Sequence, residues 1–305
     1  MGEEADTSVG CAQRSRELGE PIAGSAVECT AVWIVLEHRG SWGAKAVPES
    51  DLPEAIKARL MGWQDQLPGA RVQLVRHSGR AEGPLRFWVG VSDLARPRLV
   101  TRTLPDAEAL ASLDLPAWVA ALRAGEAVEG TEEVTEPLLL VCTNGRRDVC
   151  CAKLGVPVAQ ALEALEGVQT WQTTHLGGHR FAATLLQLPA GLCYGRVQPD
   201  EVRALAQAAR DGTVYRLDRL RGRTALHAAE QAAEAIWRAR TGRLEIDALA
   251  RAEHRPHDQH VVVTLYDRDD QPHEVRVEHR ELGPSAPPSC GKEPAPVAGW
   301  SLVRA

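Results

Sequence analysis

The stretch Leu138-Leu-Leu-Val-Cys142-Thr-Asn-Gly-Arg-Arg-Asp148-Val-Cys150-Cys151 decides the fold of this chain. Its first residues form a short, continuous apolar run, which predicts a strand buried on both faces. Asp148 is a favourable N-cap, and the apolar residues Leu154, Val158, Leu162 and Leu165 recur at helical spacing, so a helix is expected to run from Asp148 to about Leu165. A buried strand that delivers Cys142 to a loop before a helix is typical of α/β sheets, whose sites lie at the carboxyl ends of strands.

The residues after this stretch predict a regular order of elements. We expect strands over 168–173, 180–188 and 192–197, with the turn Pro189-Ala-Gly191 between the last two. Pro199-Asp-Glu201 then opens a helix that ends near Asp211-Gly212. The order strand, helix, strand, strand pair, helix is typical of a thioredoxin-like domain.

The residues before Leu138 predict a smaller unit. A strand over 31–36 is followed by a helix over 50–67 with Ser50 as candidate N-cap, then by strands over 71–76, 86–91 and 98–103 and one or two helices over 105–124. The acidic segment 125–136 is expected to be a linker. Past the thioredoxin-like segment we expect a helix over 224–240, strands over 260–266 and 273–279, and a largely irregular tail from Leu282.

The predicted fold is therefore α/β, with a C-terminal thioredoxin-like domain preceded by a smaller α/β (α+β) N-terminal domain. The expected boundaries are 1–133 for the N-terminal domain, 134–253 for the thioredoxin-like domain and 254–305 for a β extension and tail. With 305 residues, 44% of them apolar, the chain is long enough for such an arrangement.

Composition excludes several classes of protein. The net charge of −6 disfavours nonspecific binding to nucleic acid or acidic membranes, and no apolar run approaches the length of a membrane span. The start, Met1 to Asp6, is acidic where a secretory signal would be basic and then apolar, so a cytoplasmic location is expected. Seven cysteines in so long a chain do not suggest a disulfide framework, which leaves reduced thiols available to a metal. The arginine-rich stretch Arg216–Arg223 is either a solvated loop or a docking surface for an acidic partner.

Thiols and imidazoles gather between residues 142 and 179. Cys142, Cys150 and Cys151 are followed by the pair His175 and His179. Thiolates and neutral imidazoles are the donors that hold zinc, copper and the iron of iron-sulfur clusters, so this segment predicts a metal or iron-sulfur centre. Neighbours on a helix point about 100° apart, so Cys150 and Cys151 are not expected to reach one metal together.

Three classes of function remain open on the residues alone. The first is a 2Fe-2S electron carrier, and the second is a structural zinc site on the same donors. The nine-residue step from Cys142 to Cys151 is longer than the gaps of most zinc fingers and ribbons. The third is a thiol-disulfide oxidoreductase, which the lack of a Cys-x-x-Cys pair disfavours.

Several separate motifs resemble those of the sucrase/ferredoxin-like family. The N-terminal pieces are Gly24-Ser-Ala26 and Leu36-Glu-His-Arg-Gly-Ser-Trp-Gly-Ala-Lys-Ala46. The later pieces are Cys142-Thr-Asn-Gly-Arg-Arg-Asp148 with Cys151, Thr174-His-Leu-Gly-Gly-His-Arg-Phe-Ala182 and Tyr194-Gly-Arg-Val197. Characterised members of this family are thioredoxin-like 2Fe-2S ferredoxins with two cysteine and two histidine ligands.

The resemblance implies a ligand set and a role. Its ligands correspond to Cys142, Cys151, His175 and His179, with Cys150 as the alternative to Cys151 for the second thiolate. It implies electron transfer with reductase and acceptor proteins as partners, and a redox carrier rather than an enzyme with its own substrate.

The remaining polar residues and thiols lie outside the implied ligand set. Arg147 and Arg196 either contact the centre or pair with an acid such as Asp148. The other cysteines, Cys11, Cys29, Cys193 and Cys290, are expected to be small buried or incidental thiols. The loose group His254, His257 and His260 is expected to lie in a solvated loop.

Overall fold

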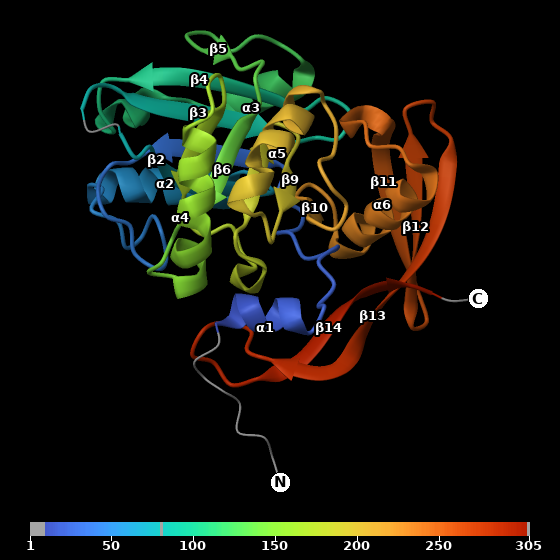
Figure 1. Ribbon diagram of the computed structural model, residues 1–305. Coiled ribbons are helices and arrows are strands. Elements are labelled where there is room, and N and C mark those ends of the chain that lie inside the picture. The colour runs from blue at the N-terminus through green and yellow to red at the C-terminus, as the bar shows by residue number, and fades with distance from the viewer. Residues whose placement is uncertain (1–9, 80–81, 304–305) are drawn as a thin grey trace.

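A computed structural model describes residues 10–79 and 82–303, so the acidic start Met1–Asp6 lies outside the described residues. Among these residues, ten strands form one continuous sheet in the order β10-β9-β8-β6-β7-β2-β1-β3-β4-β5 (Figure 1). The strands of this large sheet are β1 (Val32–Glu37), β2 (Ala70–Arg76), β3 (Leu85–Val91), β4 (Arg98–Leu104), β5 (Glu132–Glu133), β6 (Leu138–Cys142), β7 (Gln169–Thr173), β8 (Leu185–Leu188), β9 (Leu192–Tyr194) and β10 (Leu220–Arg223). A second sheet has the order β11-β12-β13-β14 and consists of β11 (Leu249–His257), β12 (His260–Asp267), β13 (Pro272–Ala286) and β14 (Ala295–Leu302).

Helices lie on and between the two sheets. They are α1 (Cys11–Glu17), α2 (Glu54–Gln66), α3 (Leu115–Ala124), α4 (Val149–Glu163), α5 (Val202–Arg210) and α6 (Ala228–Thr241), with short 3-10 turns η1 (Glu108–Ser112), η2 (His179–Phe181), η3 (Pro199–Glu201) and η4 (Ile246–Ala248). Helix α6 contacts the edge strand β10 as well as the smaller sheet, and so joins the two (Figure 1). Within the described part of the chain, no helix has the length and hydrophobicity to cross a membrane.

The α/β class predicted from the sequence is confirmed. Strand β1 is buried along its whole length because it pairs in parallel with β2 and antiparallel with β3, which explains its unbroken apolar run. Helix α2 begins one turn later than expected, with Pro53 rather than Ser50 at its N-cap. The Ser50 hydroxyl instead donates to the carbonyl of Val47, so it closes a turn before the helix.

The order of elements expected after Leu138 is present. Strand β6 is fully buried, pairs in parallel with β7 and antiparallel with β8, and is followed by α4 with Asp148 at its N-cap. The expected strand over 180–188 is too long, since η2 occupies its first residues and β8 begins only at Leu185. The thioredoxin-like assignment of this segment stays a prediction.

One seam joins the two halves of the large sheet. Strands β2 and β7 pair antiparallel, with Val75 opposite Thr173 and Arg76 opposite Gln172. Just past the seam, Thr174 and Leu74 bond to each other, with the Thr174 N–H donating to the Leu74 carbonyl at 3.0 Å and the Leu74 N–H donating to Thr174 Oγ1 at 3.2 Å. A shared apolar cluster that includes Trp33, Trp88, Leu140, Cys142 and Cys151 covers this seam. The loop that carries both predicted histidines therefore starts where the two halves meet.

Two expectations for the C-terminal region were wrong. The tail from Leu282 is not irregular, because β13 runs on to Ala286 and β14 pairs with it up to Leu302. His254 and His257 lie on β11 and His260 begins β12, so this group is part of a hairpin rather than a loop. Strand β11 exposes charged and polar residues at most positions, which hides the alternation that identifies a strand. The predicted boundary at 253/254 falls within β11.

Candidate metal centre

Strand β6 and helix α4 bring two thiols together. Cys142 ends β6, and Cys151 lies in the first turn of α4, which the Asp148 carboxylate caps by accepting from the Cys150 N–H at 2.9 Å. Gly155, one turn after Cys151, lets the helix approach the strand closely, because a Cβ there would stand 2.0 Å from the Cys142 carbonyl oxygen. Any larger residue at 155 would push the helix away and separate the two thiols.

Three donor atoms meet at this point. His175 Nδ1 lies 3.6 Å from Cys151 Sγ and 3.9 Å from Cys142 Sγ, and all three atoms lie within 4.8 Å of one another. Both cysteines are buried, and the histidine is half-buried. The structure thus brings together three of the four residues predicted as ligands.

His179, the fourth predicted ligand, stacks beside His175. Its Nδ1 lies 3.5 Å from His175 Nε2, and its Nε2 lies 2.7 Å from the carbonyl oxygen of Pro288. A carbonyl oxygen only accepts, so His179 Nε2 must carry a proton, and in the neutral ring Nδ1 then keeps a free lone pair. If that lone pair accepts from His175 Nε2–H, His175 Nδ1 is unprotonated too and faces the thiols. The Pro288 carbonyl therefore favours the tautomers that metal ligation needs.

Ionisation at the centre also favours ligation. Cys142 accepts a hydrogen bond from the Cys151 thiol, and this bond, together with His175, holds the pKa of Cys142 well below its usual value. Donating that bond raises the pKa of Cys151, and burial raises it further. Of the two thiols, Cys142 is therefore the one that loses its proton more readily. Burial lowers the pKa of His179, which favours its neutral ring. A metal bound here would hold both cysteines as thiolates.

Two arginines lie next to the centre, Arg71 half-buried and Arg221 buried. Arg71 donates to the His175 carbonyl at 2.7 Å, and Arg221 donates to the Gly177 carbonyl at 2.9 Å and to Cys193 Sγ at 3.4 Å. Arg221 also donates to the carbonyl and hydroxyl of Ser25, so it ties the Gly24-Ser-Ala26 motif to the histidine loop. Gly178 has a positive φ of 65°, and a Cβ there would stand 2.3 Å from the Arg221 guanidinium.

The arginine-rich stretch Arg216–Arg223 is only partly the solvated loop expected of it, since its last two arginines are buried. Arg221 and Arg223 are each 1% exposed, and Arg223 pairs with the buried Glu234 at 3.0 Å. The side chains of Arg216 and Arg219 do reach the surface, and each pairs with both Asp218 and Glu201. Sequence reasoning missed the role of Arg221 because alternate residues of the short strand β10 carry the charge.

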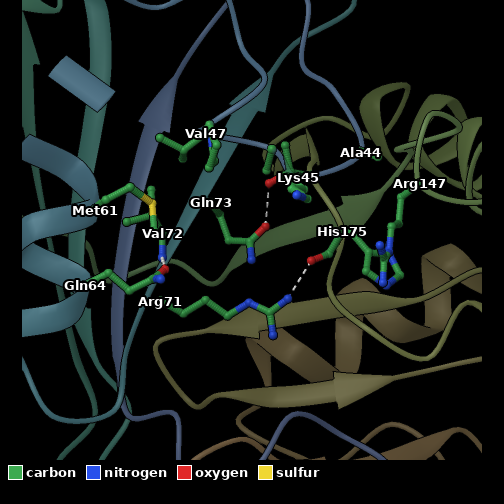
Figure 2. Close-up of a pocket in the computed structure, with 13 residues that line it drawn as sticks. Ala44, Lys45, Val47, Met61, Gln64, Arg71, Val72, Gln73, Arg147 and His175 are labelled. Carbon is green, nitrogen blue, oxygen red and sulfur yellow. Dashed lines mark hydrogen bonds between the residues drawn. The ribbon is translucent and has the colours of Figure 1, made fainter. Parts of the chain in front are cut away.

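A pocket of about 280 Å³ borders the centre on the side of His175. Figure 2 shows Arg71 and Gln73 of β2 on one side of it and His175 and Arg147 on the other. Its rim includes Ala44, Lys45 and Ala46, the end of the motif that begins at Leu36. Arg147 therefore lies beside the centre, whereas Arg196 donates to Ser15 and Glu20 and holds α1 instead.

Cys150 belongs to a different group. Its Sγ lies 3.7 Å from Cys11 Sγ and 3.2 Å from Cys290 Sγ, two thiols that the sequence pattern left as incidental. Cys151 alone of the two neighbours joins Cys142 and His175. Cys193 is buried outside the group, where burial raises its pKa.

Comparison with known proteins gives a family and two relatives. A sequence model of the sucrase/ferredoxin-like family matches residues 22–222. Two yeast proteins, both named Altered inheritance of mitochondria protein 32, are similar over shorter segments. The protein from Meyerozyma guilliermondii is 30% identical over 102 residues, which are 30% of this chain and 36% of the relative. The protein from Debaryomyces hansenii is 30% identical over 84 residues, 24% of this chain and 31% of the relative. The match thus spans about a third of each relative, and no solved structure matches the chain.

Proposed function

The chain belongs to the sucrase/ferredoxin-like family, and from this premise we propose that it is an electron-transfer protein with a 2Fe-2S cluster. The proposed ligands are Cys142, Cys151, His175 and His179. The observation that carries the proposal is the contact of two buried thiols with His175 Nδ1, beside a second histidine whose Nδ1 lies 3.5 Å from His175 Nε2. A bound cluster would supply one-electron oxidation and reduction.

Each residue of the centre has a distinct part in this proposal. Cys142 and Cys151 supply the negative charge that iron requires, and the two imidazoles add donors without charge, as in Rieske centres. Arg71 and Arg221 place positive charge in the protein interior next to the site, which favours uptake of an electron there. The Pro288 carbonyl orients His179, in the way that outer contacts orient metal-bound histidines elsewhere.

The segment around the centre fits a thioredoxin-like core, which we include in the proposal. Strands β9, β8, β6 and β7 lie side by side with β6 and β7 parallel, and α4 and α5 pack together on them. This core would place the cluster at the end of β6, with the N-terminal half supplying Arg71 across the seam.

We also propose that redox partner proteins dock at the start of α4. Val149 is 58% exposed there, which is unusual for a large apolar side chain in this protein, and Arg146 and Arg147 beside it are exposed. An apolar side chain close to two exposed arginines suits a partner with an acidic docking face.

A zinc site on the same residues is a second candidate, and the distances favour it. A thiolate and an imidazole on one tetrahedral zinc stand about 3.5 Å apart, given bonds of about 2.3 and 2.0 Å. The observed separation of 3.6 Å for Cys151 is close to this value, and that of 3.9 Å for Cys142 is somewhat longer. His179 Nδ1 would have to turn toward the thiols for either metal.

Metal and sulfide analysis of protein purified without oxygen decides between the two. The proposal expects about two iron and two acid-labile sulfide per chain, visible absorption, and an EPR signal after reduction with dithionite. The variant Cys193→Ser, which removes a buried thiol outside the proposed ligands, should keep all of these signals. Stoichiometric zinc at this site in a colourless protein would overturn the cluster and support the second candidate.

A further inference from the structure

Three cysteines from distant parts of the sequence meet at a second point. Cys11 begins α1, Cys150 lies in the first turn of α4, and Cys290 lies between β13 and β14; we refer to them as the thiol triad. Their Sγ atoms are separated by 3.7 Å (Cys11 to Cys150), 3.5 Å (Cys11 to Cys290) and 3.2 Å (Cys150 to Cys290). Two thiolates on one tetrahedral zinc stand about 3.8 Å apart, since each bond is about 2.3 Å. The triad is thus close to the size of one face of a zinc tetrahedron.

Asp148 supplies a fourth donor at the same place. Both of its carboxylate oxygens lie 3.9 Å from Cys11 Sγ, and the four residues have ligand atoms within 4.8 Å of one another. Oδ2 accepts from Ser289 Oγ and from the Cys290 N–H, each at 2.9 Å, whereas Oδ1 accepts from one backbone N–H, that of Cys150. Each carboxylate oxygen has two lone pairs, so Oδ1 keeps one for a metal.

The surroundings are closed in the manner of a structural site. Cys11, Cys150 and Asp148 are buried and Cys290 is half-buried. The backbone of Gly10 passes so close that a Cβ there would stand 3.1 Å from Cys150 Sγ. Such close packing around buried ligands is typical of a structural metal site.

We propose that the thiol triad and Asp148 bind one structural zinc ion, separate from the centre at Cys142 and Cys151. Zinc prefers this donor set because it takes thiolates and carboxylates in a tetrahedron and has no redox chemistry of its own. The inference does not depend on what the first centre holds, since the two groups share no ligand.

A zinc ion here would fasten both ends of the described chain to the fold. Helix α1 and the segment between β13 and β14 lie against each other beneath the rest of the molecule (Figure 1). They meet α4 at the triad, and the same C-terminal segment places the Pro288 carbonyl on His179. The zinc would therefore also hold in place the carbonyl that orients a histidine of the first centre.

A disulfide is the competing use of these thiols. The Cys150 and Cys290 sulfurs, at 3.2 Å, would have to close to about 2.05 Å, and Cys11 would be left as a free thiol against the bond. Zinc uses all three thiols and the carboxylate, whereas a disulfide explains only two of the four residues.

The test combines zinc analysis with X-ray absorption at the zinc edge, which iron does not disturb. Protein purified from zinc-supplemented cells without chelator should hold about one zinc ion per chain outside the first centre, with about three sulfur neighbours at about 2.3 Å. Cys290→Ser and Cys11→Ser should each lower the zinc content by about one per chain and leave the metal of the first centre in place. Cys29→Ser, at an exposed thiol, is the matched control and should change neither.

Two results would overturn the proposal. One is zinc content that is the same in Cys290→Ser as in the unchanged protein. The other is zinc-free, folded protein in which mass spectrometry finds Cys150 and Cys290 linked as a disulfide. Should either serine variant fail to fold, the absorption spectrum of the unchanged protein still decides, because a site without three sulfur neighbours contradicts the triad. Loss of iron alone would bear on the first centre and not on this one.

Discussion

Cys150 and Cys151 are neighbours in the sequence, yet they belong to different groups of donors. Cys151 turns inward to Cys142 and His175, and Cys150 turns toward α1 and the C-terminal segment. The step of about 100° between neighbours on a helix is enough to separate them. One turn of helix therefore supplies a thiol to each of two sites.

The charges around the two groups also differ. The first group lies beside two cations, the half-buried Arg71 and the buried Arg221. The second contains the carboxylate of Asp148, whose pKa burial would raise but the N–H groups of Cys290 and Cys150 lower. Added negative charge suits a divalent cation, and nearby positive charge suits a group that takes up an electron. The two groups thus differ in the charge beside their thiols, although the Asp148 carboxylate also lies 3.7 Å from His179 Nε2.

The largest effects are expected when Cys150 and Cys151 are replaced one at a time. Cys151→Ser should abolish metal binding at the first centre, at least about a hundredfold in affinity, because a thiolate ligand is lost. Cys150→Ser should leave the first centre loaded and remove zinc from the second. Iron, sulfide and zinc are measured in both purified variants. A reversal of the two phenotypes would show that the assignment of the neighbours is wrong.

The two histidines test whether the first centre holds one metal or two. With a 2Fe-2S cluster, His175→Ala and His179→Ala should both lose the visible absorption. With a single zinc on the present arrangement, His175→Ala should weaken binding by about a hundredfold and His179→Ala by only about tenfold, because His179 then acts by orienting its neighbour. Titration with a coloured zinc chelator gives the affinities. If the protein is colourless and the two variants lose equal metal affinity, the result would contradict both the cluster and the zinc site in its present arrangement.

Replacing Arg221 tests the role of the buried positive charge beside the first centre. Arg221→Met removes a buried guanidinium that donates to Gly177 and Ser25 and leaves these half-buried acceptors unpaired, so the free energy of unfolding should fall by about 2–4 kcal/mol. Urea unfolding followed by circular dichroism measures the change. Arg216→Met, at a side chain that is 47% exposed, should change stability by less than about 1 kcal/mol. Similar losses in both variants would count against a special role for Arg221.

The smallest expected effect concerns the closed surroundings of the second group. Gly10→Ala adds a Cβ 3.1 Å from Cys150 Sγ, so zinc affinity should fall by about fivefold, or roughly 1 kcal/mol. Competition with a chelator measures it. Gly62→Ala, in α2 with nothing within 4 Å of the added carbon, should leave zinc affinity unchanged. An unchanged affinity in Gly10→Ala would mean that the backbone there is not tightly packed on the thiol.

Most of the regular elements could be predicted from local patterns. Strands β1 and β6 are continuous apolar runs, and α4 combines the Asp148 cap with apolar residues at helical spacing. Strand β11 and the end of β13 were missed because their exposed, charged residues carry no alternation. Strand β10 was missed because Arg221 and Arg223 read as surface charge, although both are buried.

The sequence alone indicated the first group of donors, since Cys142, Cys151, His175 and His179 lie within one short segment, and three of them meet in the structure. Only the tertiary structure decided the rest. The pairing of β2 with β7 brings Arg71 to His175, and the return of the C-terminal strands brings Cys290 and Pro288 to α4. These contacts join residues far apart in the chain, and they arise from the burial of apolar surface by whole elements, which no local pattern of residues records.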